Sequence, residues 1–414
     1  MKPAKRREFE VSPSEAGDAK HRATRPVSVA YVRGRALIPM EVEMDKVRTI
    51  LVGAGGYGAN YVKSLLEEPI CNKLDFVAVI DPYASKSPVY DYFNGKLPIY
   101  DSLEDFFKTG NAELTIISTP IHLHYDQCIT AMKNGSHVLC EKPLVPTLEE
   151  HTKLVEAEDA TGRKISVGFQ WCYSEVILEL KRRILSGELG APNKLKTLVS
   201  WPRKWEYFTR TSGWAGKMRT SSGKAVHDSV LSNATAHYIQ NILFVLGANM
   251  EESAELKDIS AKCYRANDIE TFDTIFLEGQ AAGAKVVYVA SHGVNYHINP
   301  VMDFAFEHAR VLVNVHKDDY NLWIHYKDGR VENLGAAMGN SEISKLMYMA
   351  DYINGTRPWV CSTKTVRPFT VLLDTIFTAA DFRNFPESDI VRDHKDEATY
   401  VPGLHLELMR IFNS

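Results

Sequence analysis

The sequence predicts an α/β fold in two parts, a doubly wound parallel sheet followed by an α/β domain built on a mostly antiparallel sheet. Three observations carry this prediction. Short apolar runs alternate with helical patterns from Val47 to about residue 165, as in parallel sheets. A glycine-rich turn joins the first apolar run to the first helical pattern. From about Lys257 onward, runs of alternating apolar and polar residues are separated by turn signals, which is typical of antiparallel strands with one buried face.

Composition narrows the class of protein. With 414 residues, 45% of them hydrophobic and 24% charged, the chain resembles ordinary globular proteins. The net charge of -4 argues against nucleic-acid binding, and no run approaches the roughly 20 apolar residues of a membrane helix. The six cysteines lack paired metal-ligand spacing and are interpreted as buried thiols of a reducing compartment. We therefore predict a soluble, cytoplasmic protein with neither a nucleic-acid nor a membrane partner.

The first strand pattern, VRTILV, is followed by a glycine-rich turn and a helix with one apolar face. In such a turn Gly53 permits the tight bend, Gly55 lets backbone amides approach a pyrophosphate, and Gly58 lets the helix pack closely on the strand. The phosphates would then lie at the positive end of the helix. We expect the cofactor to contact the turn residues Gly53, Gly55, Gly56, Tyr57 and Gly58.

The second strand pattern, FVAVID, ends in Asp81, about 20 residues beyond the last glycine. A carboxylate there accepts hydrogen bonds from the ribose hydroxyls of NAD and repels the 2′-phosphate of NADP. Because Pro82 and Tyr83 carry no positive charge, the sequence favours NAD, although Lys86 keeps NADP open as the weaker alternative. A second interpretation of Asp81, as a residue that only caps a turn, also stays open.

The next strand patterns place further polar residues at the same edge of the sheet. LTIIST leads to Pro120, and HVLC is followed directly by Glu141, Lys142 and Pro143. Ligands of open parallel sheets bind at the carboxyl ends of the strands. We therefore expect Lys142 to point into the crevice that receives the reactive end of the cofactor.

Taken in order, the segments GAGGYG, Asp81, STPIHLH, HVLCEKPL and ISVGFQW resemble the Gfo/Idh/MocA family, named for glucose-fructose oxidoreductase and inositol dehydrogenase. The resemblance implies a Rossmann domain, a second α/β domain with a large, open, mostly antiparallel sheet, and NAD(P)-dependent oxidation or reduction of a sugar, cyclitol or glycoside hydroxyl. It also implies subunit pairing through that sheet, as a dimer or tetramer. Further cofactor contacts are then expected from Thr119, Pro120, His124, Glu141, Lys142 and Gln170.

Three domains follow from these patterns. Residues 1–45 are rich in basic and small polar residues and are predicted to be a disordered or accessory extension. Residues 46–165 are the predicted NAD-binding Rossmann domain. Residues 166–414 are the predicted substrate-binding and oligomerisation domain, whose C-terminal helices are expected to pack back on the first domain.

The segments GFQWCY, LKTLVSWPR and NATAHYIQNILFVLG are similar to a subgroup of the family that oxidises glycosides to their 3-oxo form.

The segment WPRKWEYFTRTSGWAGKMR concentrates aromatic and basic side chains. Aromatic rings stack on the apolar faces of sugars, and guanidinium groups donate to hydroxyls. We expect substrate contacts from Trp201, Arg203 and Trp214, together with Lys142 and His237. The alternative is a covering loop or a subunit contact anchored by its tryptophans.

Asn233 and His237 occupy the positions where the family usually has Asp-x-x-x-His, with both side chains on one face of a helix. An amide can orient an imidazole but does not stabilise its charged form as a carboxylate does. Asp228, just before the expected helix, either restores this charge or serves as a turn residue. A buried structural role for His237 is the alternative to a catalytic one.

The favoured hypothesis is hydride transfer from a secondary alcohol of a sugar, cyclitol or glycoside. His237 would take the hydroxyl proton, Lys142 would stabilise negative charge on the oxygen, and Asn233 and Asp228 would orient His237 or the substrate. One rival is an enzyme that uses bound NAD transiently for elimination, epimerisation or glycoside cleavage. Another is a non-catalytic NAD-binding sensor or subunit. No H-E-x-x-H or paired-cysteine signature supports a metal site.

Overall fold

The computed structural model describes residues 31–32, 35–36, 46–210, 213–315, 320–338 and 341–414. The chain divides into two compact units, Met1–Glu43 and Met44–Ser414. In the first unit, β1 (Tyr31–Val32) and β2 (Arg35–Ala36) pair in antiparallel fashion. The rest of the predicted extension, 1–45, lies outside the described residues. The second unit contains both predicted folded domains.

The first sheet has six parallel strands in the order β5-β4-β3-β6-β7-β8, which confirms the predicted parallel sheet. Its central strand is buried along almost its whole length because helices cover both faces. The strand order reverses between β4 and β6, on either side of β3, and this reversal opens a crevice at the carboxyl ends of the strands. The strands are β3 (Val47–Val52), β4 (Leu74–Ile80), β5 (Ile99–Tyr100), β6 (Leu114–Ile117), β7 (His137–Cys140) and β8 (Ile165–Val167).

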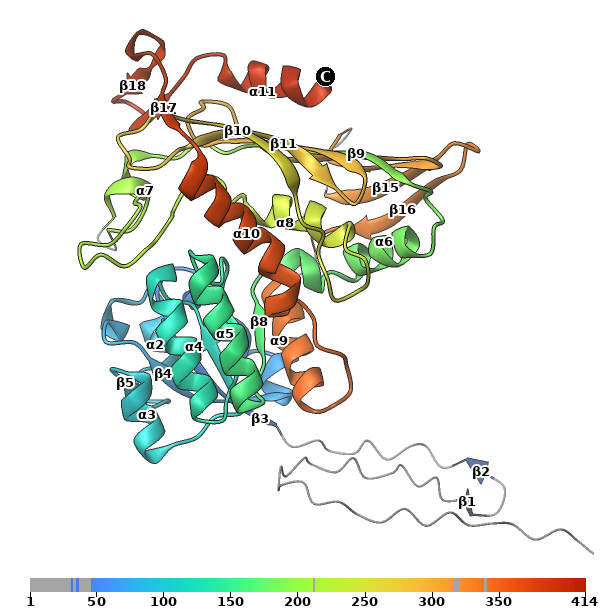
Figure 1. Ribbon diagram of the computed structural model, residues 1–414. Coiled ribbons are helices and arrows are strands. Elements are labelled where there is room, and N and C mark those ends of the chain that lie inside the picture. The colour runs from blue at the N-terminus through green and yellow to red at the C-terminus, as the bar shows by residue number, and fades with distance from the viewer. Residues whose placement is uncertain (1–30, 33–34, 37–45, 211–212, 316–319, 339–340) are drawn as a thin grey trace, which may run out of the picture. The chain divides into compact units, whose positions relative to one another are not determined.

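Helices from distant parts of the chain cover this sheet (Figure 1). On one face lie helices that connect its strands, with Ile50 and Val52 of β3 packed in the same cluster as Leu154 of α5. On the other face α1 is joined by α9 (Ser341–Ile353), whose Leu346 packs with Leu51 of β3. The connecting helices are α1 (Gly58–Leu66), α2 (Tyr90–Phe93), α3 (Leu103–Thr109), α4 (His124–Lys133) and α5 (Leu148–Thr161).

The second sheet has nine strands in the order β16-β15-β14-β13-β9-β12-β11-β10-β17. All neighbouring pairs are antiparallel except β9 with β12 and β10 with β17, so the predicted mostly antiparallel sheet is also confirmed. The strands are β9 (Pro192–Ser200), β10 (Lys257–Arg265), β11 (Thr274–Ala281), β12 (Ala284–Ser291), β13 (Ile298–Phe306), β14 (Ala309–Val313), β15 (Asn321–Tyr326), β16 (Val331–Ala336) and β17 (Phe382–Asn384). A separate hairpin pairs β18 (Val391–Asp393) with β19 (Ala398–Tyr400).

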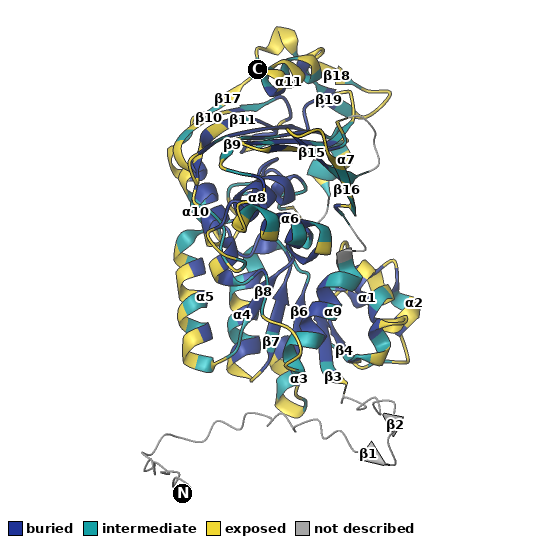
Figure 2. Cartoon of the chain, turned by 90° about the vertical axis from the view of Figure 1, so that its right-hand side faces the viewer, coloured by how far each residue is buried: buried dark blue, intermediate teal, exposed yellow. Residues whose placement is uncertain are grey.

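Alternating side chains of the large sheet face two different cores. Leu195 and Val199 of β9 pack in the cluster that contains α8, whereas Leu198 packs with α11 on the opposite face. Figures 1 and 2 show α8 and α6 beneath the sheet and α11 above it. The helices of this domain are α6 (Glu175–Leu185), α7 (Trp205–Thr209), α8 (Ala236–Val245), α10 (Thr363–Ala379) and α11 (Leu404–Asn413).

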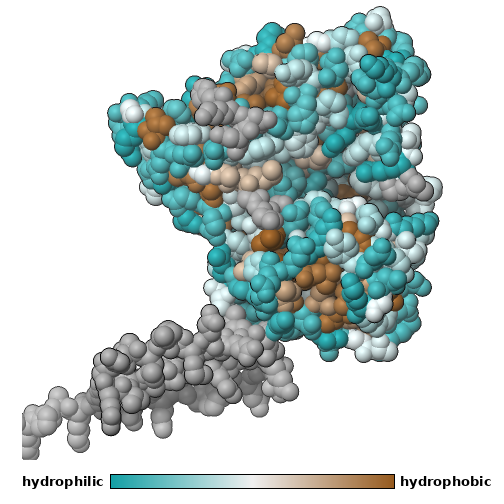
Figure 3. Space-filling model, turned by 180° about the vertical axis from the view of Figure 1, so that it is seen from behind, coloured by the Kyte–Doolittle hydropathy of each residue, from teal (hydrophilic) through white to brown (hydrophobic). Residues whose placement is uncertain are grey.

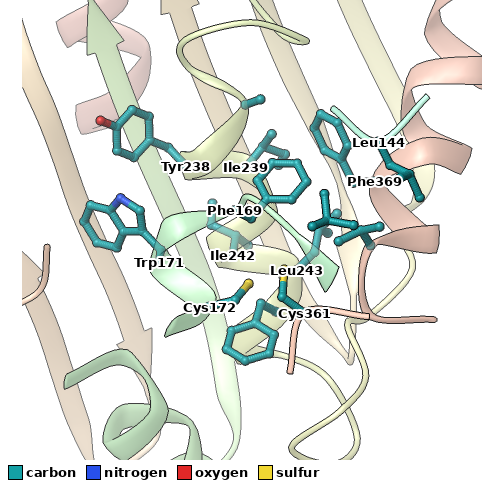
Figure 4. Packing of buried hydrophobic residues seen from close by; sticks show 14 of the residues in the cluster. Leu144, Phe169, Trp171, Cys172, Tyr238, Ile239, Ile242, Leu243, Cys361 and Phe369 are labelled. Atoms are coloured by element: carbon teal, nitrogen blue, oxygen red, sulfur yellow. The ribbon is translucent and has the colours of Figure 1, made fainter. Parts of the chain in front are cut away.

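The segment after β8 packs in a hydrophobic core to which both large sheets contribute. Phe169, Trp171 and Cys172 follow the last parallel strand and pack among side chains of α8 and α10 (Figure 4). The rings of Phe169 and Phe369 meet edge to face with centroids 5.1 Å apart. The predicted domain boundary between residues 165 and 166 falls inside β8, which runs from Ile165 to Val167. The exact position of this boundary stays a prediction.

Among the described residues no helix combines the length and the apolar character that crossing a membrane requires. On the face shown in Figure 3, hydrophilic residues predominate and apolar residues form small groups between them.

Candidate active site

A cavity of about 1360 Å³ lies at the carboxyl ends of the parallel strands. Residues from the domains of both large sheets line it. It brings together nearly all the residues singled out from the sequence. Gly58 and Arg203 do not line it. Those that do are Gly53, Gly55, Gly56, Tyr57, Asp81, Thr119, Pro120, His124, Glu141, Lys142, Gln170, Trp201, Trp214, Asp228, Asn233 and His237.

The glycine turn has the shape that a pyrophosphate requires. A Cβ on Gly53, whose φ is +85°, would lie 2.8 Å from the Ser118 carbonyl oxygen, and one on Gly58 would lie 2.0 Å from the Gly53 oxygen. These two positions therefore serve the turn and the packing of α1. A Cβ on Gly55 would meet no atom within 4 Å, so the backbone there faces open space at the N-terminal end of α1. The residues present fit a dinucleotide.

Asp81 fastens the glycine turn to the end of β4. One carboxylate oxygen accepts a hydrogen bond from the Ala54 N–H at 2.9 Å, and the other accepts from the Tyr83 N–H at 2.8 Å. The turn-capping role that the sequence left open is thus present. The side chain also lines the cavity, and each oxygen keeps a second lone pair for a ribose hydroxyl.

Lys142 reaches from the first domain to the second. Its Nζ donates to the backbone carbonyl of Asn233 at 2.8 Å. Burial lowers the pKa of Lys142 to about 8, against the opposing influence of the nearby Glu141 and Asp228 carboxylates. A substantial fraction of this side chain is therefore neutral at mildly alkaline pH.

His237 lies in the first turn of α8 and is buried against the edge of Phe169, with ring centroids 5.8 Å apart. Its Nδ1 is buried and has no hydrogen-bond partner among the described residues. Burial, together with the charges of Lys142 and Lys345, holds the pKa of His237 well below its usual range. The side chain is thus a neutral imidazole at neutral pH, and its surroundings disfavour the protonated form.

Asn233 does not share a helix face with His237, and this expectation from the sequence is wrong. Helix α8 begins only at Ala236. The hydroxyls of Ser229 and Ser232 bond to nearby backbone groups, with the Ser229 N–H donating to the Ser232 Oγ at 2.8 Å and that hydroxyl donating to the His227 carbonyl at 2.6 Å. Such local bonds compete with a helix and delay its start.

The amide of Asn233 instead points to Asp228 and Tyr207. Its Nδ2 donates to one Asp228 oxygen at 2.8 Å and to the Tyr207 hydroxyl. The other Asp228 oxygen accepts from the Gly216 N–H at 2.6 Å. Burial raises the pKa of Asp228 to about 6, although these hydrogen bonds and the charges of Arg210 and Lys142 act in the opposite direction. A carboxylate therefore does stand near Lys142, and it comes from Asp228.

His124 binds two loops together at the cavity wall. Its Nδ1 lies 3.0 Å from the Pro143 carbonyl and 3.1 Å from the Leu144 carbonyl, and its Nε2 lies 2.8 Å from the Thr119 carbonyl. Burial lowers the pKa of this imidazole. The contacts fix the loop that carries Lys142 relative to the end of β6.

Lys345 is the main residue that the sequence did not single out. Its buried Nζ donates to Glu141 Oε1 at 2.6 Å, and the Tyr61 hydroxyl donates to the same oxygen at 2.7 Å. Burial disfavours the charge of Glu141, but the Lys345 ammonium and these hydrogen bonds hold the pKa of the carboxyl below its ordinary value. Lys345 lies four residues before the buried Met349, and a lysine on an apolar helix face was the only available signal.

The aromatic and basic segment after β9 divides into structural and cavity-lining residues. The Trp205 indole donates to Thr399 at 2.8 Å and anchors α7 to β19. Trp201 and Trp214 line the cavity, as does Arg210, which was noted within this segment but not chosen as a site residue. Within the described part of the chain, no three His, Cys, Asp or Glu side chains gather where they could hold a metal ion.

Comparison with known proteins supports the resemblance to the Gfo/Idh/MocA family that the sequence motifs indicate. Residues 47–169 match the GFO_IDH_MocA family model, described as an oxidoreductase family with an NAD-binding Rossmann fold. Over 148 residues the chain is 32% identical to the inositol 2-dehydrogenase of Pseudarthrobacter chlorophenolicus, covering 35% of this chain and 43% of that protein. It is 29% identical over 203 residues to the scyllo-inositol 2-dehydrogenase (NADP(+)) IolW of Bacillus subtilis, covering 49% and 53%.

The match to these relatives thus spans about half of their length. A solved oxidoreductase from Agrobacterium radiobacter, in complex with NAD+, L-tartaric acid and magnesium, has a similar fold over 81% of this chain and 96% of that one. Its TM-score is 0.66 at 14% sequence identity. Residues 47–169 thus match the NAD-binding Rossmann domain of the Gfo/Idh/MocA oxidoreductases.

Proposed function

We propose that this protein is an NAD-dependent dehydrogenase that oxidises a secondary alcohol of a sugar or cyclitol, and that glycosides are among its substrates. The observation that carries the proposal is the meeting of Lys142, His237 and Asp228 in one cavity with the glycine turn. The inositol dehydrogenases among the relatives support the same class of reaction.

NAD bound along the glycine turn supplies the hydride acceptor. His237 accepts the hydroxyl proton, because its imidazole is neutral and its Nδ1 has no hydrogen-bond partner among the described residues. The Lys142 ammonium donates to the same oxygen and stabilises negative charge as it develops there. The Asn233 carbonyl holds Lys142 in place, and the Asn233 side chain links it to Asp228.

The first prediction concerns Lys142. The variant Lys142→Met should lower kcat by about 10²- to 10⁴-fold, since it removes the donor to the reacting oxygen. NAD binding, measured by calorimetry, should stay within about threefold because the glycine turn and Asp81 are untouched. Turnover should be assayed as NADH absorbance over a panel of sugars, cyclitols and glycosides.

The matched control is Lys153→Met, which removes an exposed lysine of α5 that pairs with Glu149. Full turnover in the Lys142→Met variant would refute the proposed role. If the wild-type protein forms no NADH but changes the mass of its substrate, the transient use of NAD is the better description. If NAD binds and no substrate is altered, the protein is a sensor or a subunit.

We also propose a cytoplasmic homo-oligomer, a dimer or tetramer formed through the large sheet. All six cysteines are free thiols, and five of them are buried, which suits a reducing compartment. Because α11 makes its main contacts with β9 and β12, the subunit contact is expected on the remaining strands. Sedimentation velocity would give the mass of the assembly.

A further inference from the structure

Around Lys142 and Asp228, positively charged side chains in and beside the cavity outnumber the negatively charged ones that lack a cationic partner. Lys142, Arg203 and Arg210 are near enough for their charges to influence one another, since Arg203 helps to lower the pKa of Lys142 and Arg210 helps to lower that of Arg203. Asp228 is the nearby carboxylate, and its pKa of about 6 leaves its charge incomplete in mildly acidic solution. Glu141 does not redress the balance because Lys345 already neutralises it.

Two hydrogen-bond donors of Arg210 meet no acceptor in the part of the chain that the structure describes. Its Nε and Nη2 are buried and unpartnered among the described residues. The same residue lines the cavity. These two nitrogens form one edge of the planar guanidinium group, which matches two oxygens of a carboxylate or phosphate in parallel hydrogen bonds.

Aromatic rings fix the plane of this guanidinium group. Its Cζ lies 4.3 Å from the ring centroid of Tyr207 and 4.1 Å from that of Trp214. The Cζ of Arg203 lies 4.9 Å from the same Tyr207 centroid, so two cations share one ring. Stacking covers the faces of the guanidinium group and leaves its edge for a polar ligand.

The nearby carboxylate does not serve this edge. One Asp228 oxygen accepts from Gly216 and the other accepts from Asn233, and no ion pair joins Asp228 to Arg210 in the described part of the chain. A neutral hydroxyl would accept from one donor and leave the excess charge in place. A ligand oxyanion would satisfy both donors and neutralise the charge.

We propose that the substrate carries an oxyanion, a carboxylate or a phosphate group, which Arg210 binds through its Nε and Nη2 while Arg203 adds to the positive potential. The inference rests on the proposed dehydrogenase function and names its substrate class: an acidic sugar or cyclitol derivative in place of a neutral one. Arg210 is then a specificity-determining residue, and it takes no part in the proton or hydride transfer.

Matched pairs of substrates test this directly. Glucose, glucuronate and glucose 6-phosphate, and inositol with inositol phosphates, should be assayed for NADH formation with the full chain and NAD. At least one acidic compound should exceed its neutral counterpart in kcat/KM by about 100-fold, the effect of a bidentate charge-assisted pair. Comparison of the carboxylate and phosphate arms identifies which oxyanion is bound.

The variant Arg210→Met should lower kcat/KM for the preferred acidic substrate by about 10²-fold, mainly through KM, and leave neutral substrates within about threefold. Arg210→Lys should retain part of the preference, since it keeps the charge and loses the paired donors. The control is Arg219→Met, which removes an exposed arginine of the same segment that bonds to the Gly223 carbonyl. An equal loss with neutral and acidic substrates would overturn the proposal and show that Arg210 only supports the fold.

Calorimetry separates this inference from the proposed function. If the NAD-loaded protein binds glucuronate or glucose 6-phosphate in a manner that depends on Arg210 but turns over nothing, the dehydrogenase function fails and the oxyanion site stands. If neutral sugars are oxidised and Arg210→Met changes neither activity nor the preference for acidic compounds, the oxyanion site fails and the dehydrogenase function stands.

Discussion

At the scale of single residues, Lys142 is a side chain of the cavity whose charge changes on the alkaline side of neutral pH. Burial lowers its pKa to about 8, so the ammonium form is lost as the pH rises through that value. The pKa of His237 lies well below its usual range, so the imidazole stays neutral on both sides of pH 7. We therefore expect kcat/KM for alcohol oxidation to fall above about pH 8. This fall would reflect the deprotonation of Lys142.

The variant Asp228→Asn should move this alkaline limb to lower pH. The Asp228 carboxylate raises the pKa of Lys142, and its removal leaves burial less opposed. The pH profile of kcat/KM measures the shift, and Asp159→Asn, a change at an exposed position on α5, is the control. An alkaline limb that stays in place or moves upward would contradict the assignment of this limb to Lys142.

The residues found from the sequence are those whose position depends on local pattern. The glycine turn, Asp81 and Lys142 each follow a strand directly, so strand order alone brings them to one edge. Lys345 was missed because its partner Glu141 lies 204 residues away, and no local pattern encodes that contact. The predicted orientation of Asn233 was wrong because helix periodicity does not apply before α8. Hydrogen bonds of Ser229 and Ser232 set the backbone conformation there.

At the scale of secondary-structure elements, the Lys345–Glu141 pair attaches α9 to the first domain. The ammonium is fully buried and also lies 4.8 Å from the ring centroids of Tyr57 and Tyr61. Glu141 directly precedes Lys142, so α9 supports the loop that carries the proposed catalytic lysine. A second contact, from the Tyr57 hydroxyl to Glu342 at 2.5 Å, ties the same helix to the glycine turn.

The variant Lys345→Met should lower the free energy of unfolding by about 3–5 kcal/mol, because it leaves a buried carboxylate without its partner. Chemical denaturation of the NAD-free protein measures the loss. The double variant Glu141→Gln with Lys345→Met should recover much of it, since no unpaired charge remains. As a contrast, Lys73→Met removes a half-exposed partner of Asp351 on the same helix and should cost no more than about 1 kcal/mol. A loss in Lys345→Met no larger than that of Lys73→Met would contradict the structural role of the buried pair.

At the scale of the whole chain, the two sheet types were predictable because strand periodicity differs between them. Buried parallel strands are continuous apolar runs, and antiparallel strands with two different faces alternate. The outer covering of the large sheet was not predictable. The resemblance implied an open sheet, whereas α11 covers part of its outer face through contacts with β9 and β12. Which face a terminal helix covers depends on tertiary packing, and helix periodicity alone does not reveal it.

Helix α11 is held by one apolar stripe. Leu404, Leu408 and Phe412 are spaced four apart and buried, whereas Leu406 on the other side of the helix is 61% exposed. The stripe packs on Leu198 and its outward-facing neighbours in β12. The helix therefore removes apolar surface from solvent that would otherwise promote aggregation.

The variant Leu408→Asp should detach α11, because it places a charge in the middle of this apolar contact. We expect the free energy of unfolding to fall by about 3 kcal/mol or more, and binding of an apolar fluorescent dye to rise as the outer face of β9 and β12 becomes exposed. Leu406→Asp makes the same chemical change on the exposed side of the same helix and should alter stability by less than about 0.5 kcal/mol. If the two variants behave alike, α11 does not protect the sheet. If Leu408→Asp also changes the sedimentation coefficient of the native assembly, the subunit contact includes the face beneath α11 and is not confined to the remaining strands.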